Sequence, residues 1–362
     1  MQRLPALDLA ERAAGRPVVS MAGVPALPMP EHVVEAAREA AGQVWPRRSR
    51  GWPELRNAVA AQLNGSFGLG ADPERELLVT HGAQHGMSVA LRALVSPGDE
   101  VLVPAPTYFF DGLVRLAGAR PVYVPSRAGW ALDTEALRSA VTPATTAILL
   151  CNPTNPTGYT PTPEELKAVL SLAAEHGLTV LSDESYARYV HSGPGYAPVQ
   201  LLRDEWPELV TVTSLSKNYA FTSWRVGYVH APEPLLDRVH RVFEWDAINV
   251  GDVAQAAACA VLTGPQGWLD DVFATFRHRR DLLCDAVERA GFPVTRPDSG
   301  IFAFPDFSRL GRSGRDLEDL LLDHGVTAIA GDAFRGPADH ARLLYGGTET
   351  DLAEVGRRLA RL

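Results

Sequence analysis

The chain has 362 residues, 46% of them hydrophobic and 21% charged, which is typical of a globular protein with one large or two modest domains. Its formal net charge of −9 gives no general attraction to nucleic acid or anionic lipid, and no apolar stretch approaches a membrane span. The cysteines, Cys151, Cys259 and Cys284, are odd in number and widely spaced, which predicts neither a disulfide framework nor a metal-ligand cluster. We therefore expect a soluble cytoplasmic protein without a metal, a nucleic-acid partner or a membrane partner.

Between residues 76 and 228, short apolar segments alternate with segments of helical periodicity. The apolar segments are 77–79, 101–103, 147–150 and 179–181, and the helical ones include 87–94 and 163–175. This alternation predicts an α/β domain with a largely parallel sheet. In such a domain, ligand-binding residues gather where loops leave the carboxyl ends of the strands.

After residue 228 the pattern becomes mainly helical up to about residue 290. Shorter strand candidates follow at 301–304, 327–329 and 342–345, with a helix predicted at 314–323. This order indicates a second, smaller α+β domain. The predicted limits are 1–45 for an N-terminal segment that joins the small domain, 46–260 for the large domain and 261–362 for the small one.

The strongest local signal is Ser-Leu-Ser-Lys at residues 214–217, followed by Arg225. A lysine amine can condense with an aldehyde if its site lowers the pKa enough to populate the neutral form. The hydroxyl groups of Ser214 and Ser216 and the guanidinium of Arg225 suit a phosphate dianion. On this motif alone, a solvated surface lysine is the ordinary alternative to a catalytic Lys217.

Three further motifs follow strand candidates, and each has a structural alternative. Residues 152–158 read Asn-Pro-Thr-Asn-Pro-Thr-Gly, which is either a simple turn or a rigid loop that presents the Asn155 amide to a ligand. Residues 182–186 contain Asp183, whose carboxylate is either a helix N-cap or the partner of a pyridine nitrogen. Residues 80–84, Thr-His-Gly-Ala-Gln, open a helix-like segment that either binds phosphate through backbone N–H groups or needs small residues for packing.

The order and spacing of these motifs resemble the class I/II aminotransferases, which belong to the aspartate aminotransferase superfamily of fold type I pyridoxal 5'-phosphate (PLP) enzymes. The resemblance covers nearly the whole chain, from residues 22–25 to 342–345. It implies a large α/β domain with a mostly parallel seven-stranded sheet flanked by helices, and a smaller α+β domain. It also implies PLP as the cofactor and a homodimer with the active site at the subunit interface.

The resemblance assigns a role to each matching residue. Lys217 would be the Schiff-base lysine and the acid-base group, and Asp183 would pair with the pyridinium nitrogen. Arg342 would clamp the substrate α-carboxylate by two parallel hydrogen bonds, and Tyr108 would stack on the ring unless it is a core tyrosine. The implied catalytic residues are Lys217, Asp183 and Tyr186. The implied cofactor contacts are Gly82, Ala83, Gln84, Tyr108, Asn155, Asp183, Tyr186, Ser214, Ser216, Lys217 and Arg225. The implied substrate contacts are Gly23, Asn155 and Arg342.

The chain departs from the family pattern in two places. Within residues 45–50, Pro46 stands where many members carry a tyrosine that reaches the partner subunit's phosphate. Either Trp45 or a nearby arginine takes that place, or the edge of the site is rebuilt, or the segment is a solvated basic loop. Val24 and Ala26 replace acidic residues in a region that borders the substrate pocket, which affects the expected specificity.

The motifs identify the cofactor and leave the reaction open. We expect an aminotransferase that converts an α-amino acid and a 2-oxo acid by a ping-pong cycle through the pyridoxamine form of the cofactor. The alternatives are a lyase that eliminates a β-substituent, for example by cleaving a C–S bond, and a decarboxylating or other specialised PLP enzyme. A non-catalytic PLP-binding module is a third class.

Overall fold

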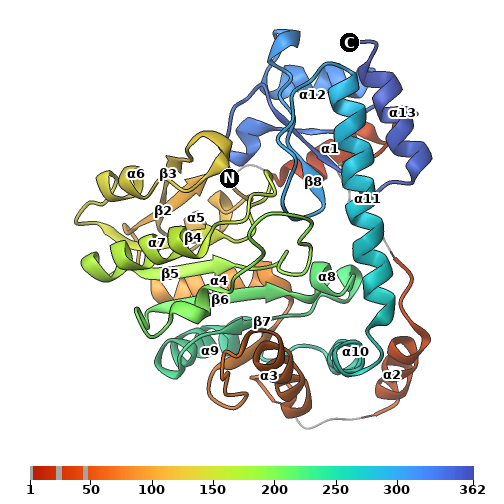
Figure 1. The fold of residues 1–362 in the computed structure, drawn as a ribbon. Helices are drawn as coiled ribbons and strands as arrows, with labels where there is room; N and C mark the ends of the chain where they lie inside the picture. The colour runs from red at the N-terminus through yellow and green to blue at the C-terminus, as the bar shows by residue number, and fades with distance from the viewer. Residues whose placement is uncertain (1–2, 22–26, 44–47) are drawn as a thin grey trace.

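The computed structural model, which describes residues 3–21, 27–43 and 48–362, contains one seven-stranded sheet (Figure 1). Its strands are β1 (Leu77–Thr80), β2 (Glu100–Ala105), β3 (Arg120–Pro125), β4 (Thr145–Cys151), β5 (Thr179–Asp183), β6 (Leu209–Ser214) and β7 (Gly227–His230). The spatial order is β1-β7-β6-β5-β4-β2-β3. The pairs from β3 through β6 are parallel, whereas β7 runs antiparallel to β1 and β6. The predicted α/β fold with a mostly parallel sheet is confirmed.

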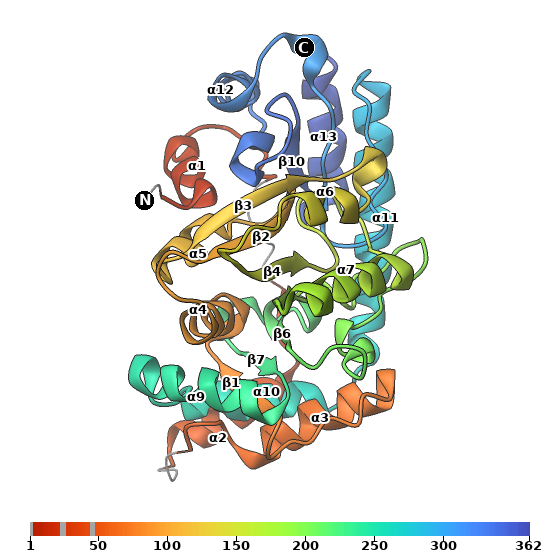
Figure 2. The same ribbon diagram turned by 90° about the vertical axis from the view of Figure 1, so that its left-hand side faces the viewer.

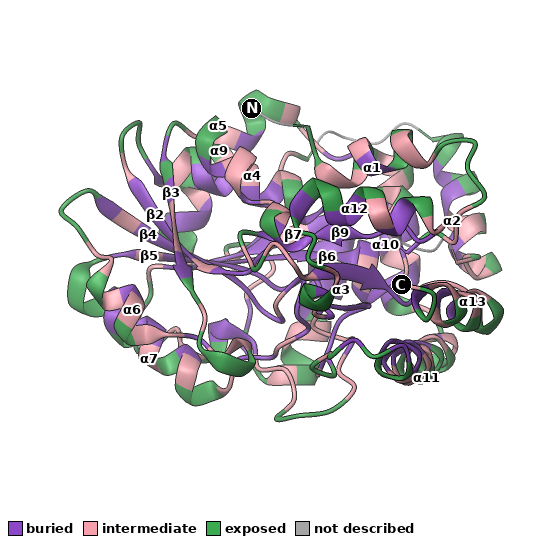
Figure 3. Ribbon diagram, turned by 90° about the horizontal axis from the view of Figure 1, so that it is seen from above, coloured by how far each residue is buried: buried purple, intermediate pink, exposed green. Residues whose placement is uncertain are grey.

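Helices cover both faces of this sheet, as parallel sheets require. They are α3 (Pro53–Phe67), α4 (Gly82–Leu94), α5 (Asp111–Leu116), α6 (Thr134–Ser139), α7 (Pro163–His176), α8 (Leu215–Asn218), α9 (Glu233–Ala247) and α10 (Asp252–Thr263). Viewed from above, α4 and α5 lie on one side of the sheet and α6 and α7 on the other (Figure 3). Strands β1, β5 and β6 are buried along almost their whole length, although β5 and β6 contain polar as well as apolar residues.

The prediction of a helix at 163–175 succeeds because the signals at its ends are local. Thr162 accepts a hydrogen bond from the Glu165 backbone N–H, and the Glu165 side chain accepts one from the Thr162 backbone, which forms a capping box. Pro163 occupies the first turn, where its missing N–H costs nothing. Gly177 ends the helix at φ 66°, a left-handed conformation that suits glycine.

A second, three-stranded sheet follows, with the order β8-β10-β9. Its strands are β8 (Phe302–Ala303), β9 (Ile329–Ala330) and β10 (Ala341–Leu344), and its helices are α11 (Gly267–Arg289), α12 (Gly314–Asp323) and α13 (Glu349–Leu359). The strand expected at 327–329 begins two residues later, because the Thr327 backbone N–H bonds Val19 rather than β10. In Figure 1, α11 runs from this smaller sheet to α10, so Leu269 packs in the large core and Phe276 in the small one.

The two N-terminal helices pack in different places. Helix α1 (Pro5–Ala13) lies beside α12 and β9 (Figure 2), and Val19 forms a bridge with Val326. Helix α2 (Glu31–Ala41) packs against α10, and its Val33 and Ala37 belong to the core of the large sheet. The proposed domain limits, with residues 1–45 joined to the small domain, therefore stay a prediction. No helix among the described residues combines the length and apolarity needed to cross a membrane.

Candidate active site

One cavity of about 580 Å³ lies at the carboxyl edge of the large sheet. Cys151, Asp183 and Ser214 are the last residues of β4, β5 and β6, and because these strands are parallel their ends meet at the same edge. The first turn of α4 lines the same cavity, as do Arg342 from the smaller sheet and the apolar side of α1. The cavity is thus built from parts that are up to 338 residues apart, from Ala6 to Leu344.

Lys217 enters this cavity from α8, a single helical turn that follows β6. Ser214 caps the turn by accepting a hydrogen bond from the Ser216 backbone N–H at 3.0 Å. Among the described residues, the amine of Lys217 has no hydrogen-bond or ion-pair partner. Burial, together with the nearby charges of Arg225 and Arg342, lowers its pKa to about 8, and Asp183 opposes the shift. The only other lysine of the chain, Lys167, lies on the surface of α7 and pairs with Glu205.

Asp183 is buried at the end of β5 and faces the same cavity. Its Oδ1 atom accepts hydrogen bonds from the backbone N–H of Ser185 at 3.0 Å and from its hydroxyl at 2.6 Å. Burial raises the pKa of Asp183, while these hydrogen bonds and the charge of Lys217 oppose the shift. No cation of the described chain forms an ion pair with it. A buried carboxylate in this state favours a ligand that brings a positive charge, such as a protonated ring nitrogen.

Groups that can bind a dianion also line the cavity. Arg225 donates from Nη1 to Ser216 Oγ at 3.1 Å and to the Thr222 carbonyl at 3.0 Å. The N-terminus of α4 begins at Gly82, so the first N–H groups of this helix have no partner within it. Gly82 has φ +78°, and a Cβ atom there would lie 3.0 Å from Arg225 Nη2. Glycine at this position therefore keeps the guanidinium close to the helix N-terminus.

Arg342, Asn155 and Tyr186 form a buried chain of hydrogen bonds. Arg342 Nη1 donates to Asn155 Oδ1 at 3.0 Å, and Asn155 Nδ2 donates to Tyr186 Oη at 3.3 Å. Burial raises the pKa of Tyr186, so this phenol stays protonated. Arg342 is only 5% exposed, yet its Nε has no partner, and its guanidinium carbon lies 4.8 Å from the Phe334 ring centroid. A buried, unpaired guanidinium N–H predicts that an anionic ligand binds beside it.

The cavity brings together nearly all of the residues that were predicted from the sequence. Tyr108 lines it and donates from its hydroxyl to Gln84 Oε1 at 3.4 Å. Gly23 lies outside the described residues, as do Val24, Ala26, Trp45 and Pro46, so their expected roles stay predictions. The predicted residues that line the cavity are Ala83, Gln84, Tyr108, Asn155, Asp183, Tyr186, Ser214, Ser216, Lys217, Arg225 and Arg342.

Sequence reasoning missed several parts of the cavity lining, of which three bear on ligand binding. Ser185, which holds the Asp183 carboxylate, is one, and Phe109 beside Arg342 is another. The third is helix α1, whose apolar residues recur at helical spacing, a signal that could have identified a helix but not its neighbours.

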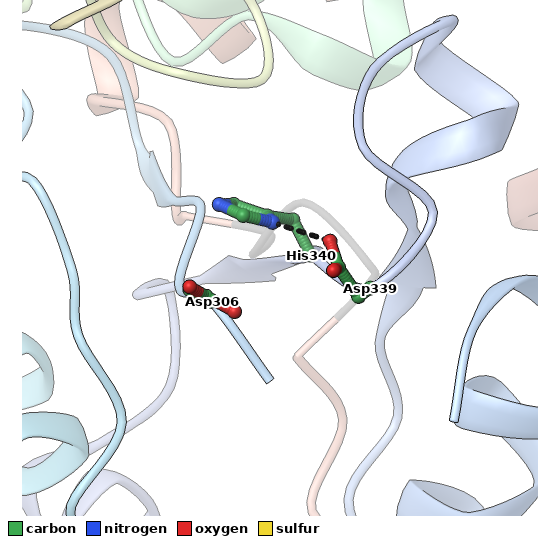
Figure 4. Close-up of side chains that lie close together, drawn as sticks. All are labelled: Asp306, Asp339 and His340. Carbon is green, nitrogen blue, oxygen red and sulfur yellow. Dashed lines mark hydrogen bonds and ion pairs between the residues drawn. The ribbon is translucent and has the colours of Figure 1, made fainter. Parts of the chain in front are cut away.

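A separate group of carboxylate and imidazole side chains lies outside this cavity (Figure 4). Asp306, Asp339 and His340 have ligand atoms within 4.8 Å of one another. His340 Nδ1 is 3.0 Å from Asp339 Oδ1, and Asp306 Oδ1 accepts a hydrogen bond from the Ser308 N–H at 2.7 Å. These contacts explain the grouping, and we assign no ion to it.

Comparison with known proteins decides the family. Residues 21–359 match the family model described as aminotransferase class I and II. The chain belongs to this family. Class I and II aminotransferases with the aspartate aminotransferase fold use PLP, so the chain is a PLP-dependent enzyme. The aminotransferase prediction is confirmed, and the relatives give no support to the lyase or decarboxylase alternative.

Individual aminotransferases match the chain over nearly its full length. It is 33% identical to a probable aspartate/prephenate aminotransferase of Thermus aquaticus, over 98% of this chain and 94% of that protein. The structure of aspartate aminotransferase from Thermus thermophilus with maleate has a TM-score of 0.94 and 30% identity, covering 100% of this chain and 97% of that one. An aromatic aminotransferase from Pyrococcus horikoshii has a TM-score of 0.91 and 29% identity, covering 98% of each chain.

The residues of the cavity fit PLP. A cofactor with a phosphate, a basic ring nitrogen and an aldehyde needs an anion-binding end, a carboxylate and an amine. One cavity supplies all three groups. The α4 N-terminus with Arg225 is the anion-binding end, Asp183, which has no ion-pair partner among the described residues, is the carboxylate, and Lys217 is the amine. Arg342 is not needed for any of these three contacts. Its Nε–H group is buried and has no hydrogen-bond acceptor among the described residues.

Proposed function

We propose that each predicted residue acts on PLP as the family resemblance implies. The phosphate is held by the N-terminus of α4 together with Ser214, Ser216 and Arg225, Asp183 faces the ring nitrogen, and Lys217 bonds the aldehyde carbon. The support is the placement of all these groups in one cavity at one sheet edge. The complete proposed set is Gly82, Ala83, Gln84, Tyr108, Asn155, Asp183, Tyr186, Ser214, Ser216, Lys217 and Arg225.

Each side chain around the cofactor then has a different role in the reaction. When bound, PLP supplies a carbonyl carbon that takes up an amino group and a ring that accepts electron density from the substrate α-carbon. With a pKa of about 8, Lys217 populates both protonation states near neutral pH, which a residue that accepts and returns the α-proton requires. The charge of Asp183 favours a proton on the ring nitrogen, while Asn155 and Tyr186 orient the phenolic oxygen.

The proposed substrates are an α-amino acid and a 2-oxo acid that take turns in the cavity. Both carry a carboxylate next to the reacting carbon, and the guanidinium of Arg342, which lines the cavity, can donate to this carboxylate. The observation that carries the proposal is that Arg342 lines the same cavity as Lys217 and has no carboxylate partner among the described residues. Relatives are named for aspartate, prephenate and aromatic amino acids, so family membership leaves the side chain of the substrate open.

The test is a half-reaction of the holoenzyme with each amino acid of a panel, in the absence of any 2-oxo acid. We expect the cofactor absorbance to change to that of pyridoxamine phosphate, with one equivalent of 2-oxo acid released per site. Addition of a second 2-oxo acid should restore the starting spectrum. Release of ammonia with a 2-oxo acid, without conversion of the cofactor, would contradict the proposal and indicate elimination.

We also propose a homodimer with the active site near the subunit interface. Three large apolar side chains, Trp245, Ile248 and Val253, are exposed within one short segment, and Trp245 is 93% exposed. Exposed apolar groups that cluster in this way mark contact surfaces. Ile248 has φ +63°, which is unfavourable for a β-branched residue and indicates a shape held for a purpose. Light scattering should give a dimer, and a fully active monomer would contradict it.

A further inference from the structure

We propose that the substrate amino acid carries an uncharged, apolar side chain and that α1 forms the wall that selects it. This inference rests on the proposed function of the cavity. It concerns the part of the cavity that is not assigned to the cofactor, between Arg342 and α1.

The side of α1 that lines the cavity is entirely apolar. Ala6, Leu9, Ala10 and Ala13 recur three and four residues apart, so they lie on one face of the helix. Leu7 also lines the cavity and is 56% exposed. Leu9 and Ala6 also pack in the core against Phe304, Ile329 and Phe334, whereas Leu7 and Ala10 stay exposed. An apolar group of the ligand can pack against this exposed part of the face.

The cations of the cavity are already assigned. Among its lining residues in the described chain, the cationic side chains are Lys217, Arg225 and Arg342. Arg225 is held at the phosphate end through Ser216, and Arg342 is the group that meets the α-carboxylate. Among the described residues, no further cationic side chain lines the cavity beside α1 to pair with a second carboxylate. An anionic side chain placed there would lose its hydration without gaining a partner, which is strongly unfavourable.

An aromatic ring links Arg342 to this apolar wall. Phe109 stacks on Phe334 with ring centroids 4.8 Å apart, and its ring centroid lies 5.8 Å from the guanidinium carbon of Arg342. When a substrate binds Arg342 by its α-carboxylate, the Phe109 ring therefore lies close to the first atoms of the substrate side chain. Phe109 and the α1 residues line the same cavity, so the surface available to a substrate side chain is continuous.

Ion pairs on the outer side of α1 hold the wall in place. Arg12 pairs with Glu318 at 2.6 Å, and Arg315 pairs with Asp8 at 2.6 Å. Glu318 also accepts a hydrogen bond from the Ala330 N–H at 3.0 Å, which ties the pair to β9. The apolar face of α1 is thereby oriented toward the cavity by charges on its other face.

Matched substrate pairs test the inference. The half-reaction rate constant divided by the dissociation constant is measured for methionine against glutamate and for leucine against aspartate, which have similar sizes and differ in charge. We expect the neutral member of each pair to be favoured by about 100-fold or more, because the anion has no partner. Equal or better use of glutamate would overturn the inference and indicate a cation from residues 44–47 or a second subunit. If no amino acid converts the cofactor, the proposed function itself fails.

Equilibrium binding gives a readout without turnover. We expect the holoenzyme to bind 3-phenylpropionate at least about tenfold more tightly than maleate, measured by calorimetry. Tighter binding of maleate would overturn the inference.

A charge placed on α1 provides the reciprocal test. Ala10→Arg should improve the use of glutamate relative to methionine by about tenfold or more, because it adds a cation to the exposed apolar face. Glu11→Gln, on the face away from the cavity, changes the net charge by the same +1 and is the matched control, which should leave the ratio unchanged. An equal change in both variants would show a long-range charge effect and would contradict a direct role of the α1 face.

Discussion

The carboxyl edge of the large sheet and helix α1 line the same cavity in opposite ways. The sheet edge contributes polar groups such as Asp183 and Ser214, which are buried and fixed by hydrogen bonds within a few residues. Helix α1 contributes apolar side chains such as Leu7, which remain exposed to the cavity, and it is held by ion pairs to α12. The edge therefore supplies groups for chemistry, and the helix supplies a surface that can vary without disturbing them.

This difference has an energetic basis. A buried polar group that loses its partner costs about 1–3 kcal/mol, so the contacts at the sheet edge depend strongly on one another. The exposed ion pair between Arg315 and Asp8 contributes only about 0–1 kcal/mol, so this part of the attachment of α1 can change at little cost in stability. Substitutions at the edge should thus affect catalysis broadly, whereas those on α1 should affect which substrate is used.

The largest effect is expected for Lys217→Ala. Removal of the amine takes away the group that bonds the cofactor and transfers the α-proton, so turnover should fall by about 10⁴-fold or more. Lys167→Ala removes the exposed lysine of α7 and should leave turnover unchanged. Borohydride reduction of the wild-type holoenzyme, followed by peptide mapping, should place the cofactor on the peptide with Lys217. A label on Lys167 would contradict the assignment.

Arg342→Lys should have the next largest effect. Lysine keeps the positive charge but offers a point charge in place of a planar fork, so the parallel hydrogen bonds to a carboxylate are lost. We expect kcat/KM to fall about 10- to 100-fold for every amino acid of the panel, because all share the α-carboxylate. Arg357→Lys, on the exposed side of α13, is the control. A loss confined to acidic substrates would assign Arg342 to the side chain instead.

The lowered pKa of Lys217 predicts that the reactivity of its amine rises about tenfold between pH 7 and pH 9. With a pKa of about 8, its amine is mostly charged at pH 7 and mostly neutral at pH 9. Only the neutral amine reacts, so brief acetylation of the cofactor-free enzyme should label Lys217 about tenfold more at pH 9 than at pH 7, with a plateau above. Peptide mass spectrometry resolves it from Lys167. A rise that continues to pH 11 would show that burial does not lower this pKa.

The sheet edge could be predicted from the sequence because its signals are local. Lys217 and the residues around Asp183 follow buried strands within a few positions, and Arg225 lies shortly before β7. The sheet brings these strand ends together. The end of α7 at Gly177 and the start of α4 at Gly82 are local signals of the same kind. The resemblance to a known family then gave each of these residues a role.

The α1 wall could not be predicted because it depends on contacts between distant residues. The apolar spacing in α1 predicts a helix with one buried face, but nothing in residues 5–13 says that this face borders Arg342. Strand β9 shows a similar limit, since its two residues are placed by pairing with β10 and not by their own pattern. Polar groups that are fixed locally are readable from sequence, whereas a shared apolar surface requires the fold.

The smallest effect is expected for Arg12→Gln on the outer side of α1. Arg12 pairs with the buried Glu318 and the exposed Asp319 of α12, and the loss of these contacts should lower the free energy of unfolding by about 1–3 kcal/mol. A less firmly oriented α1 should still raise KM for leucine and methionine by a few-fold while kcat is unchanged. Arg3→Gln breaks the exposed pair with Glu11 and is the matched control, with no expected change in KM. If Arg12→Gln lowered kcat for all substrates equally, α1 would belong with the catalytic edge, and the division between a chemical edge and a selective wall would be wrong.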